Sequence, residues 1–152
     1  MTGHGIDLLD DPVATELLAS RLPAHLAYTW TDGTPRVVPI WFHWTGTEVV
    51  MGTPPRAPKL RALHDGDIVC VSIDSSDWPY HVLSIRGPVT VTTVDGVVPE
   101  YVAAAKRYFG EQQGTDWVAQ LPAGIQMSRV AVQPTWVSLI DFDTRMPSAL
   151  SA

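Results

Sequence analysis

The sequence has a single cysteine, fewer basic than acidic residues and no long hydrophobic run. With Cys70 alone, no disulfide can form within the chain, so nothing requires an oxidising compartment. No apolar stretch approaches the roughly 20 residues that cross a bilayer. Residues 1–5 also lack the charged-then-apolar pattern of a signal peptide. We therefore expect a cytoplasmic protein with no membrane partner.

Positive charge is scarce: 10 Lys and Arg stand against 16 Asp and Glu, which gives a net charge of −6. A chain this acidic has no general attraction to nucleic acid, and no basic stripe with interleaved aromatic residues is present. A local basic cluster would instead suit a small anion. We expect a small-molecule ligand and no nucleic-acid partner.

Several catalytic motifs are also missing. There is no G-x-S-x-G nucleophile elbow, no G-x-G-x-x-G, no Walker loop and no H-E-x-x-H. The five histidines have no helical i, i+4 ligand spacing, so no metal site is predicted. Cys70 lies in a run predicted to be a buried strand, where a thiol is inert.

What the sequence contains is typical of one globular domain. Its 152 residues are 45% hydrophobic and 17% charged, and six are tryptophan, whose rings should line a core, a subunit interface or a ligand face. We divide residues 1–152 into an N-terminal helix within 1–20, a barrel over 25–142 and a tail over 143–152. Asp11 would cap the helix and Pro12 would occupy its first turn.

Six β-prone runs follow, joined by turn residues. Asp32-Gly33 predicts a tight hairpin in which both residues take positive φ, and Gly46 predicts a second turn, so the first three strands should form a meander. Pro39 should lie on a strand edge, because it cannot donate to a ladder. The run 67–74 is apolar enough to be buried on both faces. The six runs are residues 25–30, 36–44, 48–53, 67–74, 81–94 (with a bulge or bend at Gly87-Pro88) and 127–142 (interrupted at Pro134).

Two further helices are predicted at residues 99–109 and 114–121. With mainly β structure and few helices, the pattern favours a six-stranded antiparallel split β-barrel.

The segment 53–61 is the strongest site candidate. It places Arg56, Lys59 and Arg61 beside the hydroxyl of Thr53, and a short helix starting near Pro58 would add its N-terminal amides. This combination predicts an anion site, although a solvated basic patch has the same composition. A second candidate feature is a set of aromatic residues: Trp41, Phe42, Trp44, Trp117 and Trp136. They could form a wall of the ligand pocket, or alternatively belong to the core and a dimer interface.

The order of these features resembles the pyridoxamine 5′-phosphate oxidase-like superfamily of flavin-binding split barrels. The resemblance runs from about residue 19 to 142. It is carried by the Asp-Gly hairpin, the strand at residues 36–42, the loop at 53–59, and the segment 63–67 before a Val-rich strand.

The resemblance implies a homodimer with FMN, or the deazaflavin coenzyme F-420, at the subunit interface. Thr53 and Lys59 match the family's phosphate-binding threonine and the lysine six residues later, helped here by Arg56. The strand that would lie along the isoalloxazine ring comprises Arg36, Val37, Val38 and Pro39. Trp136 would approach the cofactor across the dimer.

Two departures from the family limit the activity that is implied. Val82 stands where pyridoxamine phosphate oxidases carry a glutamine, and their C-terminal arginine-histidine motif is missing, so that oxidation is not expected. We expect a flavin-dependent oxidoreductase for an unidentified small molecule, with Tyr80 and His81 as the nearest candidates for proton transfer. Two alternatives are a non-enzymatic flavin or deazaflavin carrier or sensor and, given the histidines, a haem-binding split barrel.

Overall fold

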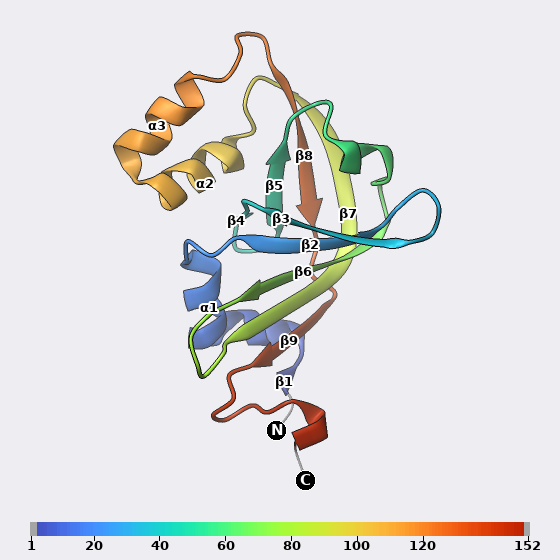
Figure 1. The fold of residues 1–152 in the computed structure, drawn as a ribbon, viewed down its shortest axis with the longest axis vertical. Helices are drawn as coiled ribbons and strands as arrows, with labels where there is room; N and C mark the ends of the chain where they lie inside the picture. Colours follow the sequence, from blue (N-terminus) through green and yellow to red (C-terminus); the bar gives the residue numbers. More distant parts are fainter. Residues whose placement is uncertain (1–2, 151–152) are drawn as a thin grey trace.

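The computed structural model describes residues 3–150, which fold as two antiparallel sheets joined by one long strand (Figure 1). Strand β7 (Val82–Asp95) belongs to both sheets. One sheet has the order β3-β2-β6-β7-β9-β1, and the other has the order β7-β8-β5-β4. The remaining strands are β1 (Gly3–His4), β2 (Ala24–Thr29), β3 (Pro35–Ile40), β4 (His43–Trp44), β5 (Val49–Thr53), β6 (Ile68–Asp74), β8 (Gln126–Val132) and β9 (Trp136–Ile140).

The mainly β fold is confirmed, but the strand count of six is wrong: the described residues form nine strands. The predicted run 36–44 is broken into β3 and β4, which pair with different neighbours, and the run 127–142 becomes β8 and β9. The short β1 adds the ninth by pairing with β9. The arrangement is consistent with a split barrel whose strands change partners at each break.

The predicted three-strand meander keeps both of its turns, because β4 pairs with β5 across the Gly46 turn, but its middle strand is broken. β2 pairs with β3, but β5 pairs with β4 and β8 rather than with β3. In the first turn Gly33 has a φ of 84° and Asp32 does not have positive φ, so only one of the two predicted residues adopts that conformation. Asp32 instead accepts hydrogen bonds from the backbone and hydroxyl of Thr34.

Gly87 marks the point where β7 changes partners. Before it, β7 pairs with β9, and after it with β8. A Cβ at Gly87 would lie 1.7 Å from the carbonyl oxygen of Gln133, so only glycine permits this approach. On one edge of β7, the ladder with β6 continues through Gly87 and Pro88 without an extra residue, so the predicted bulge is absent. On the opposite edge of β7, the partner strand changes at this point.

One face of the first sheet packs into the core and the other is open. In β6 the side chains of Val69, Val71 and Ile73 are buried, whereas Ile68 is 63% exposed and Cys70 is partly exposed. The expectation that this strand is buried on both faces, with Cys70 in the core, is therefore wrong for the single chain. The alternation is that of an antiparallel sheet with one solvent-facing side.

Helix α1 (Pro12–Ala19) covers one end of the barrel, after a 3-10 turn η1 (Ile6–Asp10). As predicted, Asp11 caps it by accepting from the backbone of Val13 at 2.9 Å, and Pro12 occupies its first turn. Its inner face buries Leu17 and Leu18, each worth about 1.5–3 kcal/mol when fully removed from water.

Helices α2 (Pro99–Phe109) and α3 (Glu111–Ala119) form a hairpin beside the second sheet, and Gly110 separates them as predicted. Arg107 ties α2 to the barrel by donating to the carbonyls of Ser20 and Phe42, and Tyr108 donates to that of Leu22 at 2.9 Å. Helix α3 begins three residues before the predicted 114. Within residues 3–150, no helix has the length and apolarity needed to cross a membrane.

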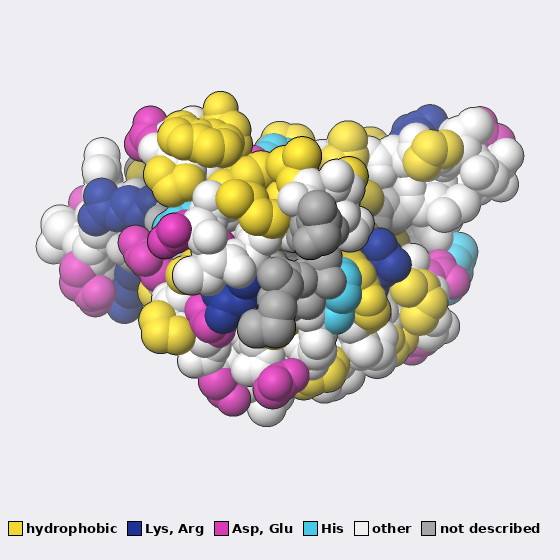
Figure 2. Space-filling model, turned by 90° about the horizontal axis from the view of Figure 1, so that it is seen from below, with side chains coloured by type: hydrophobic (Ala, Val, Ile, Leu, Met, Phe, Trp, Pro, Cys, Tyr) yellow, Lys and Arg dark blue, Asp and Glu magenta, His cyan; other side chains and the backbone are white. Residues whose placement is uncertain are grey.

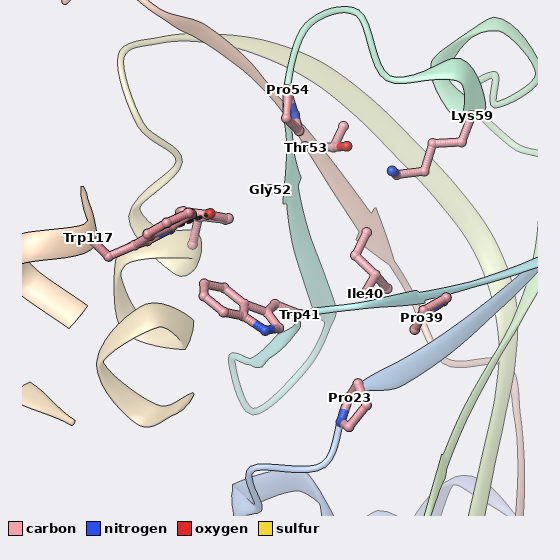
Figure 3. Close-up of a pocket in the computed structure, with 10 residues that line it drawn as sticks. Pro23, Pro39, Ile40, Trp41, Gly52, Thr53, Pro54, Lys59 and Trp117 are labelled. Atoms are coloured by element: carbon pink, nitrogen blue, oxygen red, sulfur yellow. Dashed lines mark hydrogen bonds between the residues drawn. The ribbon is translucent and has the colours of Figure 1, made fainter. Parts of the chain in front are cut away.

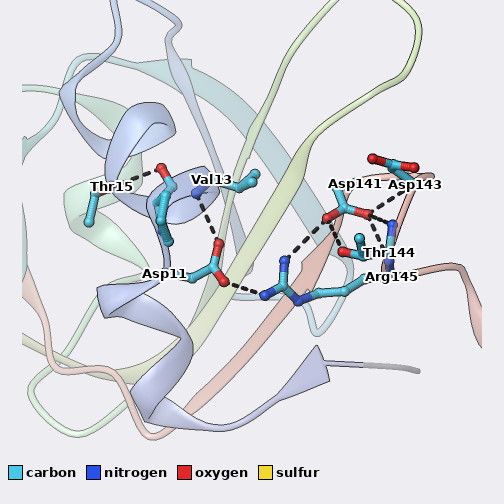
Figure 4. A network of polar contacts seen from close by, with 8 residues as sticks. Asp11, Val13, Thr15, Asp141, Asp143, Thr144 and Arg145 are labelled. Carbon is cyan, nitrogen blue, oxygen red and sulfur yellow. Dashed lines mark hydrogen bonds and ion pairs between the residues drawn. The ribbon is translucent and has the colours of Figure 1, made fainter.

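The C-terminal segment ends in a 3-10 turn, η3 (Ser148–Leu150), and is fastened to α1 by a polar network (Figure 4). Arg145 bridges Asp141 and the capping residue Asp11. Of the predicted tail 143–152, residues 151 and 152 lie outside the described part of the chain.

Candidate cofactor site

A cavity of about 390 Å³ lies where the ends of β3 and β5 meet the α2–α3 hairpin (Figure 3). This volume is near the lower end of the roughly 300–1,000 Å³ typical of ligand sites. Thr53 and Lys59 point into its upper part, Pro39 and Ile40 form its floor, and aromatic side chains form one wall. The lining comprises Pro23, Pro39, Ile40, Trp41, Gly52, Thr53, Pro54, Lys59, Tyr101 and Trp117.

Thr53 is the last residue of β5, where the strand ladder with β8 fixes its position opposite Ser128. The residue is only 1% exposed, and its Oγ1 atom has no hydrogen-bond partner among the described residues. A buried hydroxyl without a partner costs about 1–3 kcal/mol. A hydroxyl held in this state at a cavity wall is suited to a ligand that supplies the missing hydrogen bond.

Lys59 faces Thr53 from the 3-10 turn η2 (Pro58–Arg61). Its ammonium group forms no ion pair with any residue of 3–150, and burial lowers the pKa of its side chain. The predicted short helix is this four-residue 3-10 turn, so no helix N-terminus contributes to the site. The cation and the hydroxyl form a compact pair that matches one anionic group.

The floor of the cavity is the end of an edge strand. β3 pairs with β2 and with no other strand of the described chain, so its second edge is free, as Pro39 predicts. Pro39 and Ile40 present apolar surface there and Pro39 offers no N–H. This edge suits a flat apolar ring better than another strand.

The aromatic wall is built by Trp41 and helices α2 and α3. The Trp41 ring stacks on Tyr108 with centroids 5.1 Å apart and an interplanar angle of 16°. Trp117 donates through Nε1 to the hydroxyl of Tyr101 at 2.9 Å, which fixes both at the cavity. Of the three aromatic residues predicted together, Trp41 lines the cavity, Phe42 lies in the core, and Trp44 packs against the core.

Gly52 explains how the helix comes so close to the strand. A Cβ at Gly52 would lie 2.7 Å from the Cβ of Tyr101, so a larger residue would push α2 away from β5. Gly52 and Tyr101 were not predicted as site residues. Gly52 lies in a strand directly before Thr53. A glycine inside a strand often marks the close approach of another segment, so its position in the sequence indicates such a contact.

Comparison with protein-family models gives no match, and comparison with curated proteins gives none. Solved structures are similar. A protein named F-420 reductase has 28% identity and a TM-score of 0.61, covering 80% of this chain and 93% of that chain. An FAD- and haem-binding protein from Mycobacterium smegmatis has 20% identity and a TM-score of 0.61, over 97% and 77% of the two chains.

A third similar structure, from Clostridium acetobutylicum, is described as a member of the pyridoxinephosphate oxidase family. It has 11% identity and a TM-score of 0.58, covering 85% of this chain and 86% of that chain. At such low identity, this match and the one from M. smegmatis bear on the fold alone. The chain has the pyridoxamine 5′-phosphate oxidase-like split-barrel fold. The resemblance indicated by the sequence is confirmed.

The split barrel brings together three of the predicted cofactor-binding residues, Thr53, Lys59 and Pro39. Arg56 lies outside this cavity and lines a neighbouring hollow. The guanidinium of Arg36 lies 3.8 Å from the ring centroid of Trp30, and that of Arg61 lies 5.6 Å from the same centroid, so both pack on the hairpin.

The other predicted residues do not line the cavity of the single split-barrel chain. Val37 is exposed, Val38 packs against the core, and Trp136 lies between His4 and Arg86 on β9. Their assignment to the cofactor stays a prediction.

Tyr80 and His81 lie in the β6–β7 connection at the opposite end of the barrel from the β5–η2 loop (Figure 1). Tyr80 contacts the rings of Trp78 and Phe142, and the backbone of His81 donates to Ser75. Figure 2, which views this end from below, shows hydrophobic side chains gathered near the chain termini. No role of Tyr80 or His81 in proton transfer is supported by the cavity of the single chain.

Proposed function

We propose that this protein binds a flavin-type cofactor, FMN or the deazaflavin coenzyme F-420, and uses it to oxidise or reduce a small molecule. The cofactor phosphate would lie between Thr53 and Lys59, and its ring along Pro39 and Ile40. The observation that carries the proposal is the unpartnered hydroxyl of Thr53 facing an unpaired, half-buried lysine in one cavity.

The chemistry of the walls supports this orientation. Lys59 is the one cation of the lining, so the anionic end of a ligand belongs there, while proline, isoleucine and tryptophan surround the rest. When bound, such a cofactor supplies the hydride chemistry, and the protein binds and orients it. Trp41 and Trp117 line the same space with apolar ring surface. The 28% identity to the protein named F-420 reductase supports the deazaflavin alternative.

A homodimer is part of the proposal, and the open face of the first sheet supports it. Across this face the strand register aligns Val37, Ala27, Cys70, Arg86 and Trp136 in one row. Apolar side chains such as Ile68 are left uncovered beside the row. A second copy packed on this face would bury them and bring the partner's Trp136 strand across the dimer.

Two alternatives remain distinct from this proposal. A carrier or sensor would bind the cofactor without turnover. Haem binding would require a ligand to iron, but His43 and His64 line two other hollows, and no histidine of the described chain lines the main cavity.

The test is a fluorescence titration of the purified protein with FMN and with F-420. We expect binding of at least one at micromolar concentration or below. The Lys59→Gln variant should bind that cofactor about 10- to 100-fold more weakly, since a hydrogen bond to a charged group is worth about 1.5–3 kcal/mol.

The matched control is Lys106→Gln, which removes a lysine that pairs with Glu111 on the helix hairpin. Its affinity should stay within about twofold of the wild type. If neither FMN nor F-420 bound to the protein, the proposal would be wrong. Binding without oxidation or reduction of the bound cofactor by any small molecule tested would favour the carrier.

A further inference from the structure

A separate hollow of about 260 Å³ lies where helices α1 and α2 meet strand β4 (Figure 1). It shares no lining residue with the cofactor cavity. Its walls come from α1, from both residues of β4 and from one arginine of α2. The lining residues are Thr15, Leu18, Ala19, His43, Trp44 and Arg107.

Arg107 brings a positive charge to this hollow and has no anionic partner. Its Nε donates to the carbonyl of Ser20 at 2.9 Å and its Nη2 to the carbonyl of Phe42, but within residues 3–150 it forms no ion pair and its Nη1 makes no hydrogen bond. The guanidinium also lies 4.8 Å from the ring centroid of Phe42 and 4.9 Å from that of Tyr108. These contacts hold the cation in place before any ligand arrives, and its charge remains unpaired.

His43 is the second polar group of the wall. Its Nδ1 is buried and has no partner among the described residues, so Nε2 is the ring nitrogen left to meet a ligand. Burial and, after it, the charge of Arg107 lower the pKa of His43, and Glu100 opposes them. The ring is therefore neutral at pH 7 and can donate one N–H. Glu100 itself is bound to Arg129 at 2.8 Å and does not line the hollow.

The remaining lining is mostly apolar. Leu18, Ala19 and Trp44 provide hydrocarbon and ring surface, and the hydroxyl of Thr15 already donates to the carbonyl of Pro12 at 3.0 Å. No Asp or Glu is among the lining residues of the described chain. An uncharged apolar molecule would leave the cation unpaired, and a bare anion such as acetate would leave the apolar wall uncovered.

We propose that this hollow binds a small monocarboxylate with an apolar body, such as an aromatic acid with one ring. The carboxylate would accept from Arg107 and from Nε2 of His43, and the body would pack on Leu18 and Trp44. The volume lies just below the roughly 300 Å³ at which ligand sites usually begin, which suits a one-ring acid. The site is independent of the proposed cofactor site, because the two have no residue in common.

The experiment is an NMR titration of the histidine ring resonances with benzoate, with its neutral isostere benzamide and with acetate. We expect benzoate to shift the resonances of His43 with a Kd below about 1 mM. His64, which lines a different hollow, should not respond. Benzamide lacks the charge and acetate lacks the ring, so each should bind at least about tenfold more weakly.

A variant that fills the hollow gives an independent check. Ala19 lines it from an exposed position at the end of α1, so Ala19→Trp can occupy the space without disturbing the core. It should weaken benzoate binding by about tenfold or more. The matched control is Ala119→Trp, which adds the same side chain at an exposed position on α3 outside the hollow and should leave the affinity unchanged.

Three results would overturn the inference. One is the absence of any shift of His43 up to about 10 mM benzoate. Another is binding of benzamide or acetate as tightly as benzoate, which would contradict the assignment of a carboxylate with an apolar body. The third is benzoate affinity that Ala19→Trp leaves unchanged, which would place the acid elsewhere. Cofactor binding, measured by the separate titration with FMN and F-420, would stand or fall on its own.

Discussion

The hydroxyl of Thr53 is buried at the end of a strand and has no partner in the described chain. Removing a buried hydroxyl that makes no hydrogen bond relieves its desolvation cost. We therefore expect Thr53→Val to raise the free energy of unfolding of the cofactor-free protein by about 1 kcal/mol. The same change should weaken cofactor binding severalfold, and urea unfolding together with a binding titration would measure both effects.

Thr92→Val is the matched control, because Thr92 is an exposed strand residue on β7 with no side-chain hydrogen bond. It should alter neither quantity appreciably. If Thr53→Val destabilised the protein and left cofactor affinity intact, the hydroxyl would have a structural partner rather than a ligand.

At the residue scale, the sequence predicted the anion-binding end of the site but not its walls. Thr53 and Lys59 are close in sequence and follow a recognisable strand, so their proximity could be predicted. Tyr101 reaches the cavity from a helix almost 50 residues later, and its position depends on the contact with Gly52. Arg56 lies only three residues from Thr53 and from Lys59, yet it lines a different hollow. Closeness in sequence therefore does not predict which cavity a side chain lines.

At the scale of elements, the junction between the C-terminal segment and α1 depends on Asp141. Its carboxylate accepts backbone hydrogen bonds from Asp143, Thr144 and Arg145 at 2.7–3.0 Å. Burial raises the pKa of Asp141, but these hydrogen bonds outweigh it and hold the pKa well below its usual range. A carboxyl whose pKa is lowered by folding stabilises the protein above its unfolded pKa.

We expect Asp141→Asn to lower the free energy of unfolding at pH 7 by about 2–4 kcal/mol, because it breaks a buried charged network. The unfolded pKa of an aspartate is about 3.9, so the difference from wild type should be full at pH 7 and shrink as the pH falls below about 4. Denaturant unfolding across this range would measure it.

Asp143→Asn serves as control, since Asp143 is exposed and its side chain accepts no hydrogen bond in the structure. It should have little effect at either pH. A difference between Asp141→Asn and wild type that stayed constant down to pH 3 would show that the charge of Asp141 does not stabilise the fold.

Elements with local signals were predicted well, and strand partners were not. The α1 cap and the glycine between α2 and α3 depend on neighbouring residues, so the sequence shows them directly. The break between β3 and β4 depends on which strands lie alongside. β3 pairs with β2, but β4 turns back to β5, and no local residue pattern specifies that choice.

At the scale of the whole molecule, the open sheet face predicts self-association. Ala27 lies on that face, one strand in from the edge, directly opposite Val37 and Cys70 on the two neighbouring strands. Ala27→Arg should convert the proposed dimer into a monomer, because it places a long charged side chain between Val37 and Cys70 in the proposed interface. Light scattering coupled to size-exclusion chromatography would show the change in mass.

Ala119→Arg introduces the same side chain at an exposed position on α3, away from the sheet face, and should leave the dimer unchanged. A wild-type protein that is monomeric at all concentrations would remove the homodimer from the proposal. The expectation that both faces of β6 are buried would then be wrong for the assembled protein as well, since the single chain covers only one of them.

The free edge of β3 also bears on how the protein avoids aggregation. An exposed strand edge normally invites another chain to add a strand through backbone hydrogen bonds. β3 carries Pro35 and Pro39, which lack the N–H donors that such a strand would need, and Arg36 between them adds charge. The edge is thereby closed to polymerisation and still open to a flat ligand that needs no ladder, so one pair of prolines both keeps the cavity accessible and protects the chain from its own copies.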